Sequence, residues 1–271
     1  MPTFPNSTFI AHHVKHYLFL ISLMGALTSC VTTTTGGFIA TASDEQAVRD
    51  YVSLAIGYYD ANDMTGARRN ISNALEIDDR HSPAYNVLAL ILQNEGDIEQ
   101  SESAFERAIN LDRNNSRARN NYAALLFSLE KYEEAYRQLD RVVADSMYEG
   151  RAIAFENLGR SALALNDGEA AENAFQRALQ LNANLYLSAL ELSIVRFESG
   201  NLQGARAAFS QYLTTVDFYK IPYPPKALLA GIKIEGEFGN QAKVDEFALL
   251  LVSLYPESAE AKIYQEQSNV N

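Results

Sequence analysis

The side chains that most often carry out catalysis or hold metal ions are scarce in this sequence. Three of its four histidines, His12, His13 and His16, lie near the N-terminus; His81 stands alone, and Cys30 is the single cysteine. No His or Cys cluster has metal-ligand spacing, and nothing marks a partner with which His81 could form a nucleophilic triad. The glycines do not form a phosphate-cradling loop. We therefore expect a protein that is not an enzyme and has no metal, no cofactor and no small-molecule substrate.

The excess of acidic over basic side chains limits the kinds of molecule that the protein can bind. The chain has 34 acidic against 22 basic side chains, a formal net charge of −12. Binding to a phosphate backbone needs clustered Lys and Arg, so we expect no nucleic-acid partner. A lone cysteine also excludes a disulfide within one chain.

The one cysteine has a distinctive setting. Tyr17 to Leu27 is an apolar run of 11 residues, too short for a spanning helix of about 20, so residues 1–29 are predicted to be a signal peptide. The sequence Leu27-Thr28-Ser29-Cys30 resembles the bacterial lipobox. That resemblance implies cleavage before Cys30, a covalent lipid such as palmitate on its thiol and, because Val31 follows, sorting to the outer membrane. The alternative is an ordinary signal peptide with a coincidental cysteine. Residues 30–47, polar and glycine-containing at their start, are predicted to be the lipidated N-terminus and a flexible tether.

The rest of the chain is repetitive, with a period of about 34 residues. Small residues recur at the same position of successive units, and each is followed at a constant spacing along the chain by a large residue. The small residues are Ala55, Ala89, Ala123, Gly159 and Ser193, and the large ones are Ile71, Phe105, Leu139, Phe175 and Phe209. This pattern resembles the tetratricopeptide repeat, which implies an all-α superhelix, an α-solenoid of about six helix-turn-helix units.

The repeat units are predicted at 48–81, 82–115, 116–149, 152–185, 186–219 and a divergent 225–258. The repeat domain thus spans 48–258, and 259–271 is a capping helix and tail. In the sixth unit Gly231 and Ile232 reverse the usual large-then-small order. Ser82 before Pro83 is typical of a helix N-cap.

Two features of the connections are irregular. The turn position within each unit carries Gly or Asn except in the third, where Glu130 does not favour a left-handed backbone. Residues 215–225 form an aromatic, proline-rich insertion, which is either a solvated spacer or a partner-contacting loop.

The resemblance to tetratricopeptide repeats also implies a concave groove lined by the fifth, ninth and twelfth residues of each unit. In the first three units these positions are apolar, aromatic or amide-bearing: Val52, Ile56, Tyr59, Asn86, Leu90, Gln93, Asn120, Ala124 and Phe127. Such a lining suits an amphipathic helix or an apolar strand, whose backbone Asn86 and Asn120 could hydrogen-bond. The alternative is that some of these residues are core, or are covered by the chain's own N-terminal segment.

A lipobox followed by about six such repeats resembles the pilotins of type IV pili. The resemblance extends to Asn120-Asn121-Tyr122, to Leu228–Ile234, to Phe238-Gly239-Asn240 and to Leu254–Ser258. It implies a lipid-anchored protein on the periplasmic face of the outer membrane. Such a protein binds the secretin subunit and promotes its localisation and multimerisation. Two alternatives are a lipoprotein scaffold for outer-membrane barrel assembly or for periplasmic envelope enzymes, and an envelope hydrolase with an unrecognised site, which loss of hydrolase activity in His81→Ala would indicate.

Overall fold

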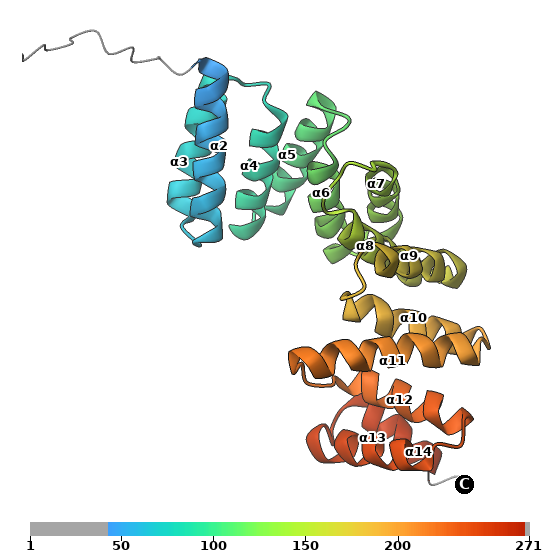
Figure 1. Cartoon of the computed structure of the whole chain (residues 1–271). Helices are drawn as coiled ribbons and strands as arrows, with labels where there is room; N and C mark the ends of the chain where they lie inside the picture. Colours follow the sequence, from blue (N-terminus) through green and yellow to red (C-terminus); the bar gives the residue numbers. More distant parts are fainter. Residues whose placement is uncertain (1–42, 269–271) are drawn as a thin grey trace, which may run out of the picture. The chain divides into compact units, whose positions relative to one another are not determined.

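The protein is described here by a computed structural model that covers residues 43–268, and this part of the chain is entirely helical between its turns (Figure 1). The predicted signal peptide and Cys30 lie outside the described residues. The helices are α2 (Asp44–Asp60), α3 (Met64–Ile77), α4 (Ser82–Asn94), α5 (Ile98–Leu111), α6 (Ser116–Ser128), α7 (Tyr132–Ala144), α8 (Arg151–Ala164), α9 (Gly168–Leu181), α10 (Tyr186–Glu198), α11 (Leu202–Tyr219), α12 (Pro225–Glu237), α13 (Gln241–Leu254) and α14 (Ala259–Ser268).

Consecutive helices pair as antiparallel hairpins, and each hairpin packs on the next. The predicted all-α stack of six helix-turn-helix repeats is therefore confirmed. Two boundaries differ from the prediction. The first helix begins at Asp44, inside the predicted 30–47 tether and four residues before the predicted repeat domain, with Asp44 and Glu45 in its positively polarised first turn. Helix α11 continues to Tyr219, so the first five residues of the predicted 215–225 loop are helical.

The core is made by the alternation of small and large residues. The large side chains of the second helices are almost inaccessible: Ile71 1%, Phe105 0%, Leu139 1%, Phe175 0% and Phe209 1% exposed. Ile71, Phe105 and Leu139 share a core cluster with Ala55, Ala89 and Ala123, the small residues of the preceding first helices. A Cβ atom added to Gly159 would lie only 2.7 Å from the ring of Phe175, so the small residue is what allows the two helices to approach closely.

The sixth repeat keeps this pairing despite its reversed sequence order. Gly231 faces the ring of Phe247, where an added Cβ would lie 2.7 Å away. Gly231 and Phe247 have the same spacing along the chain as Gly159 and Phe175. Gly231 therefore takes the place of the small residue, and the reversal reflects a shift of the turn by one position.

All six turns within the hairpins contain a left-handed residue, including the predicted exception. Glu130 has φ 59°, close to that of Asn62 and Asn166. Two backbone bonds hold it there, from Glu130 N to Phe127 O at 3.0 Å and from Lys131 N to Leu126 O at 2.9 Å. The third repeat thus accepts an unfavourable conformation, costing about 1 kcal/mol relative to glycine, because the hairpin geometry requires it.

The predicted role of Ser82 as an N-cap is wrong. His81 caps α4, since its Nδ1 accepts a hydrogen bond from Ala84 N at 3.2 Å. The Ser82 hydroxyl instead donates to Ala108 O at 2.8 Å and accepts from Asn115 Nδ2 at 2.8 Å. The hydroxyl thus joins α4 to α5 of the same repeat and to Asn115, the N-cap of α6, a role that local sequence does not reveal.

Candidate functional site

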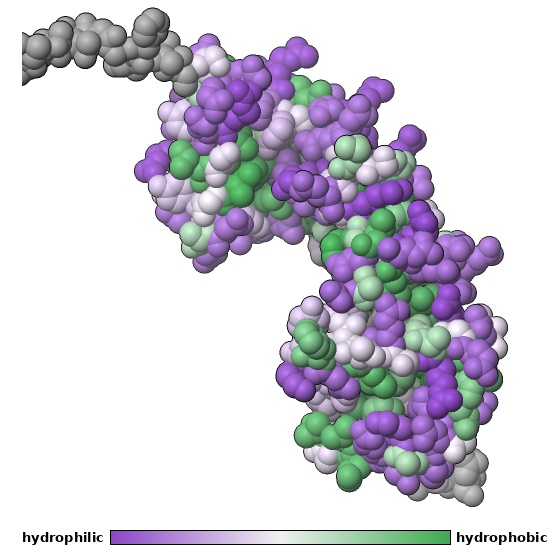
Figure 2. Space-filling view, viewed as in Figure 1, coloured by the Kyte–Doolittle hydropathy of each residue, from purple (hydrophilic) through white to green (hydrophobic). Residues whose placement is uncertain are grey.

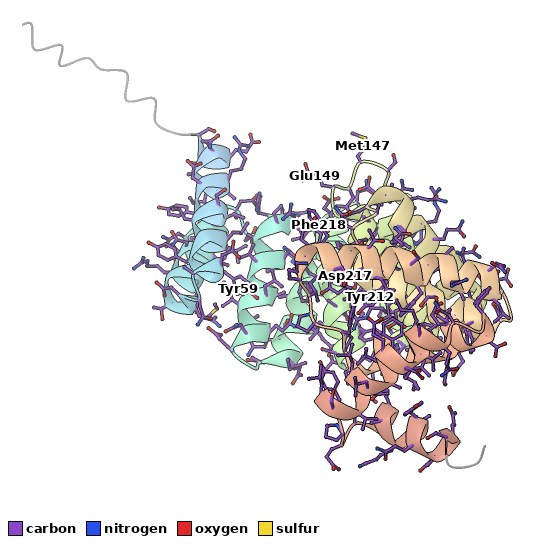
Figure 3. The ribbon with its side chains drawn as sticks, turned by 60° about the horizontal axis from the view of Figure 1, so that its bottom comes forward. Tyr59, Met147, Glu149, Tyr212, Asp217 and Phe218 are labelled. Atoms are coloured by element: carbon purple, nitrogen blue, oxygen red, sulfur yellow. The ribbon has the colours of Figure 1, made fainter. Side chains whose placement is uncertain are left out.

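The candidate site is the surface formed by the first helices of the repeats, α2, α4, α6, α8, α10 and α12, together with the capping helix α14. The nine predicted groove residues of the first three repeats do not all reach it. Val52 and Asn86 are buried; Tyr59, Leu90, Gln93, Asn120 and Phe127 are half-buried; and Ile56 and Ala124 are exposed. Tyr59 lies near the end of α2 (Figure 3), and hydrophobic side chains are visible over α2 and α4 in Figure 2.

The two predicted amides have different surroundings. Asn86 is 3% exposed, and its Oδ1 accepts a hydrogen bond from Asn121 Nδ2 at 3.0 Å, which links α4 to α6. The Oδ1 atom of Asn120 is buried and has no hydrogen-bond partner within residues 43–268. A buried acceptor without a donor is destabilising, so Asn120, rather than Asn86, has an unsatisfied acceptor atom.

Phe127 forms the C-terminal limit of the predicted groove. The guanidinium of Arg160, from the next first helix, lies 4.9 Å from the centre of its ring. Tyr132 meets the same ring edge-on at 5.1 Å. One face of Phe127 is therefore covered by a cation, a contact worth about 0.5–1 kcal/mol at an exposed site.

A more enclosed apolar pocket lies in the last two repeats. It has a volume of about 310 Å³ and is bounded by α10, α12 and α14. Its apolar lining is Ile194, Phe197, Leu229, Ala230, Ile234 and Ile263, and its charged lining is Lys226, Lys233, Glu198 and Glu260. Four of these side chains occupy the fifth, ninth or twelfth offset of their units, so the repeat register could have found them. The contribution of α14 could not be found that way.

The charges of this C-terminal pocket are unequally paired. Lys226 Nζ lies 2.7 Å and 2.8 Å from the two carboxylate oxygens of Glu191 on α10. Lys233 makes no ion pair among residues 43–268. The pocket therefore combines an apolar floor with one ammonium group, Lys233, and two carboxylates, Glu198 and Glu260, none of which makes an ion pair among residues 43–268.

The aromatic residues around the predicted 215–225 loop divide into two groups. Tyr223 packs inward: its ring is 6.3 Å from Phe247, its hydroxyl donates to Asp217, and its carbonyl accepts from the Tyr255 hydroxyl at 3.0 Å. Phe218 is 77% exposed at the end of α11 (Figure 3). The loop is therefore partly structural, and only its helical beginning presents an aromatic surface.

His81 does not assemble a catalytic set. It is half-buried and serves as a helix cap, and burial lowers the pKa of its imidazole, which favours the neutral ring that accepts the Ala84 N–H. Residues 43–268 contain no group of three or more His, Cys, Asp or Glu side chains arranged to hold a metal ion. In that same part of the chain, none of the helices has the length and apolar character needed to cross a bilayer.

Comparison with known proteins agrees with this arrangement of helices. Two family models, both described as tetratricopeptide repeat, match residues 92–146 and 156–219. The type IV pilus assembly protein PilF of Pseudomonas aeruginosa is 29% identical over 251 residues, covering 92% of this chain and 97% of PilF.

Solved structures give the same result. The structure of P. aeruginosa PilF superimposes with a TM-score of 0.75 at 28% identity, covering 83% of this chain and 99% of that one. PilW, described as a widely conserved type IV pilus biogenesis factor, gives 0.65 at 25% identity, covering 81% and 99%. YrrB, a tetratricopeptide-repeat protein with a peptide-binding site, shares the fold at 18% identity, with a TM-score of 0.61 over 72% of this chain and 97% of its own. These similarities identify the chain as a tetratricopeptide-repeat protein related to the type IV pilus biogenesis proteins PilF and PilW.

Proposed function

We propose that the chain is a pilotin, an outer-membrane lipoprotein that binds the secretin subunit of a type IV pilus and promotes its localisation and multimerisation. The observation that carries the proposal is the similarity to PilF along 92% of the chain. The sequence Leu27-Thr28-Ser29-Cys30 supports the lipid anchor, and the first-helix surface supports the binding of a protein segment.

The proposed mechanism has two separable parts. A lipid on Cys30 anchors the protein to the periplasmic face of the outer membrane, since several acyl chains at about 0.8 kcal/mol per buried CH₂ hold it firmly. The first-helix surface binds an apolar segment of the secretin subunit, through the predicted groove residues that are not buried: Ile56, Tyr59, Leu90, Gln93, Asn120, Ala124 and Phe127. A repeat scaffold suits this task because its helices hold the surface in place without the ligand.

The anchor is tested by Cys30→Ala. We expect the variant to lose acylation and to leave the membrane fraction, while the repeats remain folded. Fractionation with an antibody to the protein measures this directly, and a Ser29→Ala variant is the matched control. Unchanged membrane retention of Cys30→Ala would refute the lipid anchor.

The cargo is tested by purification of the tagged protein from its own outer membrane in mild detergent, with mass spectrometry of what accompanies it. Recovery of a secretin, together with loss of secretin rings in a deletion strain, would support the pilotin. Recovery of barrel-assembly components or cell-wall enzymes without secretin would overturn it in favour of a scaffold.

A further inference from the structure

A hollow between the second and third repeats concentrates positive charge in an acidic protein. It has a volume of about 840 Å³, lies among α5, α6 and α7, and is lined by Arg113, Arg119 and Arg141. The chain as a whole has a formal net charge of −12, so three guanidinium groups facing one hollow need a physical explanation.

None of these three arginines forms an ion pair with an acidic side chain of residues 43–268, and Asp112 acts on Arg119 only from beyond ion-pair distance. No Asp or Glu oxygen of residues 43–268 lies within ion-pair distance of them. Arg119 donates only to neutral oxygens, at 3.1 Å and 3.0 Å to the Arg113 carbonyl and at 2.6 Å to Gln138 Oε1. Burial, and then the positive charges of Arg141 and Arg113, lower the pKa of the Arg119 guanidinium. The fold therefore holds the guanidinium groups of Arg113, Arg119 and Arg141 close to one another although their like charges repel.

The one carboxylate that lines the hollow is already used. Asp145 accepts hydrogen bonds from the Ser116 hydroxyl at 2.6 Å and from Met147 N at 3.0 Å. The bond from Ser116 is the main reason that the pKa of Asp145 lies below its usual range. Its charge fixes the start of the α7–α8 loop, and an excess of positive charge remains in the hollow.

The surroundings of the hollow point to the source of the missing anion. Each hairpin reverses the chain, so α2, α4 and α6 run in the same direction and begin on one edge of the stack (Figure 1). Asp44, the first residue of α2, therefore lies at this edge. The α7–α8 loop projects from this edge, and its Met147 is 86% exposed (Figure 3). Cys30 precedes Ser43 by 13 residues (43 − 30), an extended reach of about 45 Å at most.

We propose that this arginine hollow binds a phosphate group, and that the phosphate belongs to an anionic phospholipid of the membrane that carries the anchor. The membrane as source rests on the proposed lipidation of Cys30. Guanidinium groups match phosphate oxygens with paired hydrogen bonds, and Met147 enters the interface beside them. The contact orients the repeats on the membrane with the starting edge of the first helices toward it.

The test uses the chain from Val31 onward, which keeps every described core cluster, since these all lie within residues 48–261. Co-sedimentation is measured with phosphatidylcholine vesicles with and without phosphatidylglycerol. The variant is Arg113→Gln/Arg141→Gln, because neither side chain makes a hydrogen bond or ion pair within residues 43–268 and the fold should not depend on them. The matched control is Arg69→Gln/Lys220→Gln, which removes two exposed charges elsewhere.

We expect the original chain to bind the phosphatidylglycerol vesicles and the Arg113/Arg141 variant to bind them about 30-fold more weakly, with the control unchanged. Adding Met147→Ser to the Arg113/Arg141 variant should weaken its binding to these vesicles further. Equal binding by the variant and the control, or no binding by the original chain, would overturn the proposal.

Two further probes separate the sources of the anion. Binding of inorganic phosphate that depends on Arg113 and Arg141, without vesicle binding, would overturn the membrane source. Binding of an oligoglutamate peptide in preference to vesicles would assign the hollow to an acidic protein segment instead. Because none of these assays contains a secretin or the lipid on Cys30, their failure is distinguishable from failure of the proposed function.

Discussion

The first three repeats and the last two share one backbone but differ in what their first helices present. In the N-terminal half, amide groups are prominent: Asn86 is joined to Asn121, and Asn120 keeps a buried acceptor without a donor among residues 43–268. In the C-terminal half, α14 closes an apolar pocket of about 310 Å³ beside Lys233, which has no ion-pair partner in the same range. The repeat therefore fixes where a binding surface lies, while a few side chains at fixed offsets decide its chemistry.

The comparison also separates two kinds of connection between repeats. The N-terminal half combines a neutral bond, from Asn121 Nδ2 to Asn86 Oδ1, with the partly exposed ion pairs Arg68–Glu95 and Lys131–Glu102. The C-terminal half adds an ion pair with a buried carboxylate, in which Arg206 donates to both oxygens of Glu235 at 3.1 Å and 2.9 Å. In a stack where each repeat contacts only its neighbours, such junctions decide how far a local disturbance spreads.

The largest expected effect is loss of a core ring in either half. Phe105→Ala and Phe209→Ala should each lower the free energy of unfolding by about 3–5 kcal/mol. We expect the larger loss for Phe209, whose ring contacts both Tyr212, at 5.7 Å between centroids, and Phe247, at 5.9 Å. Urea unfolding followed by circular dichroism measures both. An unchanged midpoint for either variant would contradict the described packing.

A smaller loss of stability is expected when the close approach of two helices is prevented. Gly231→Ala should cost about 1–3 kcal/mol, because the new methyl group would lie 2.7 Å from Phe247 and 2.8 Å from Phe209. Gly57→Ala is the matched control, since nothing lies within 4 Å of its Cβ position, and it should be neutral or stabilising. Thermal unfolding distinguishes them, and equal melting temperatures would show that the sixth repeat is loosely packed.

The binding roles of the two halves can be compared directly. Leu90→Lys introduces a charge into the N-terminal groove, and we expect about tenfold weaker binding of the secretin segment, or about 1.4 kcal/mol. Ile263→Glu makes the same test of the C-terminal pocket. Ile77→Glu is its control, since Ile77 and Ile263 are both 40% exposed but Ile77 lies outside the pocket. Binding is measured by isothermal titration calorimetry.

The outcome assigns the site to one half. Weaker binding only for Leu90→Lys would place the cargo on the first three repeats. Weaker binding only for Ile263→Glu would move it to the last two. Equal affinity for all three variants would exclude the first-helix surface as the cargo site.

The smallest expected effect is a pH dependence confined to the N-terminal half. Burial lowers the pKa of His81 below that of the unfolded chain, so the unfolded chain binds more protons as the pH falls below about 6.5. Stability should therefore decline modestly on acidification through that range, as the ring loses its acceptor for Ala84 N. Unfolding of His81→Asn between pH 7 and pH 5 is the measurement, because Asn keeps a cap without titrating. An equal decline in this variant would rule out His81 as the cause.

Much of the fold could be predicted because the repeat encodes it locally. The pairing of Ala55 with Ile71, or of Gly159 with Phe175, needs only helical periodicity and a hairpin turn, and both recur in every unit. Glu130 is a further example. The repeat register predicts a turn at this position, although glutamate does not favour the left-handed backbone that the turn requires. The first helices, and with them the candidate surface, follow from that register.

The helices, their pairing and the offsets that face one another follow from the order of the residues alone, because these features depend on contacts within about one repeat. Which of those offsets remain accessible depends instead on how the helices of different repeats pack. Val52 and Asn86 are buried by neighbouring helices, α14 completes the C-terminal pocket, and Arg113, Arg119 and Arg141 meet from separate elements. Each of these outcomes depends on side chains brought together from different repeats, and spacing along the chain does not encode which neighbour will cover, pair with or repel a given group.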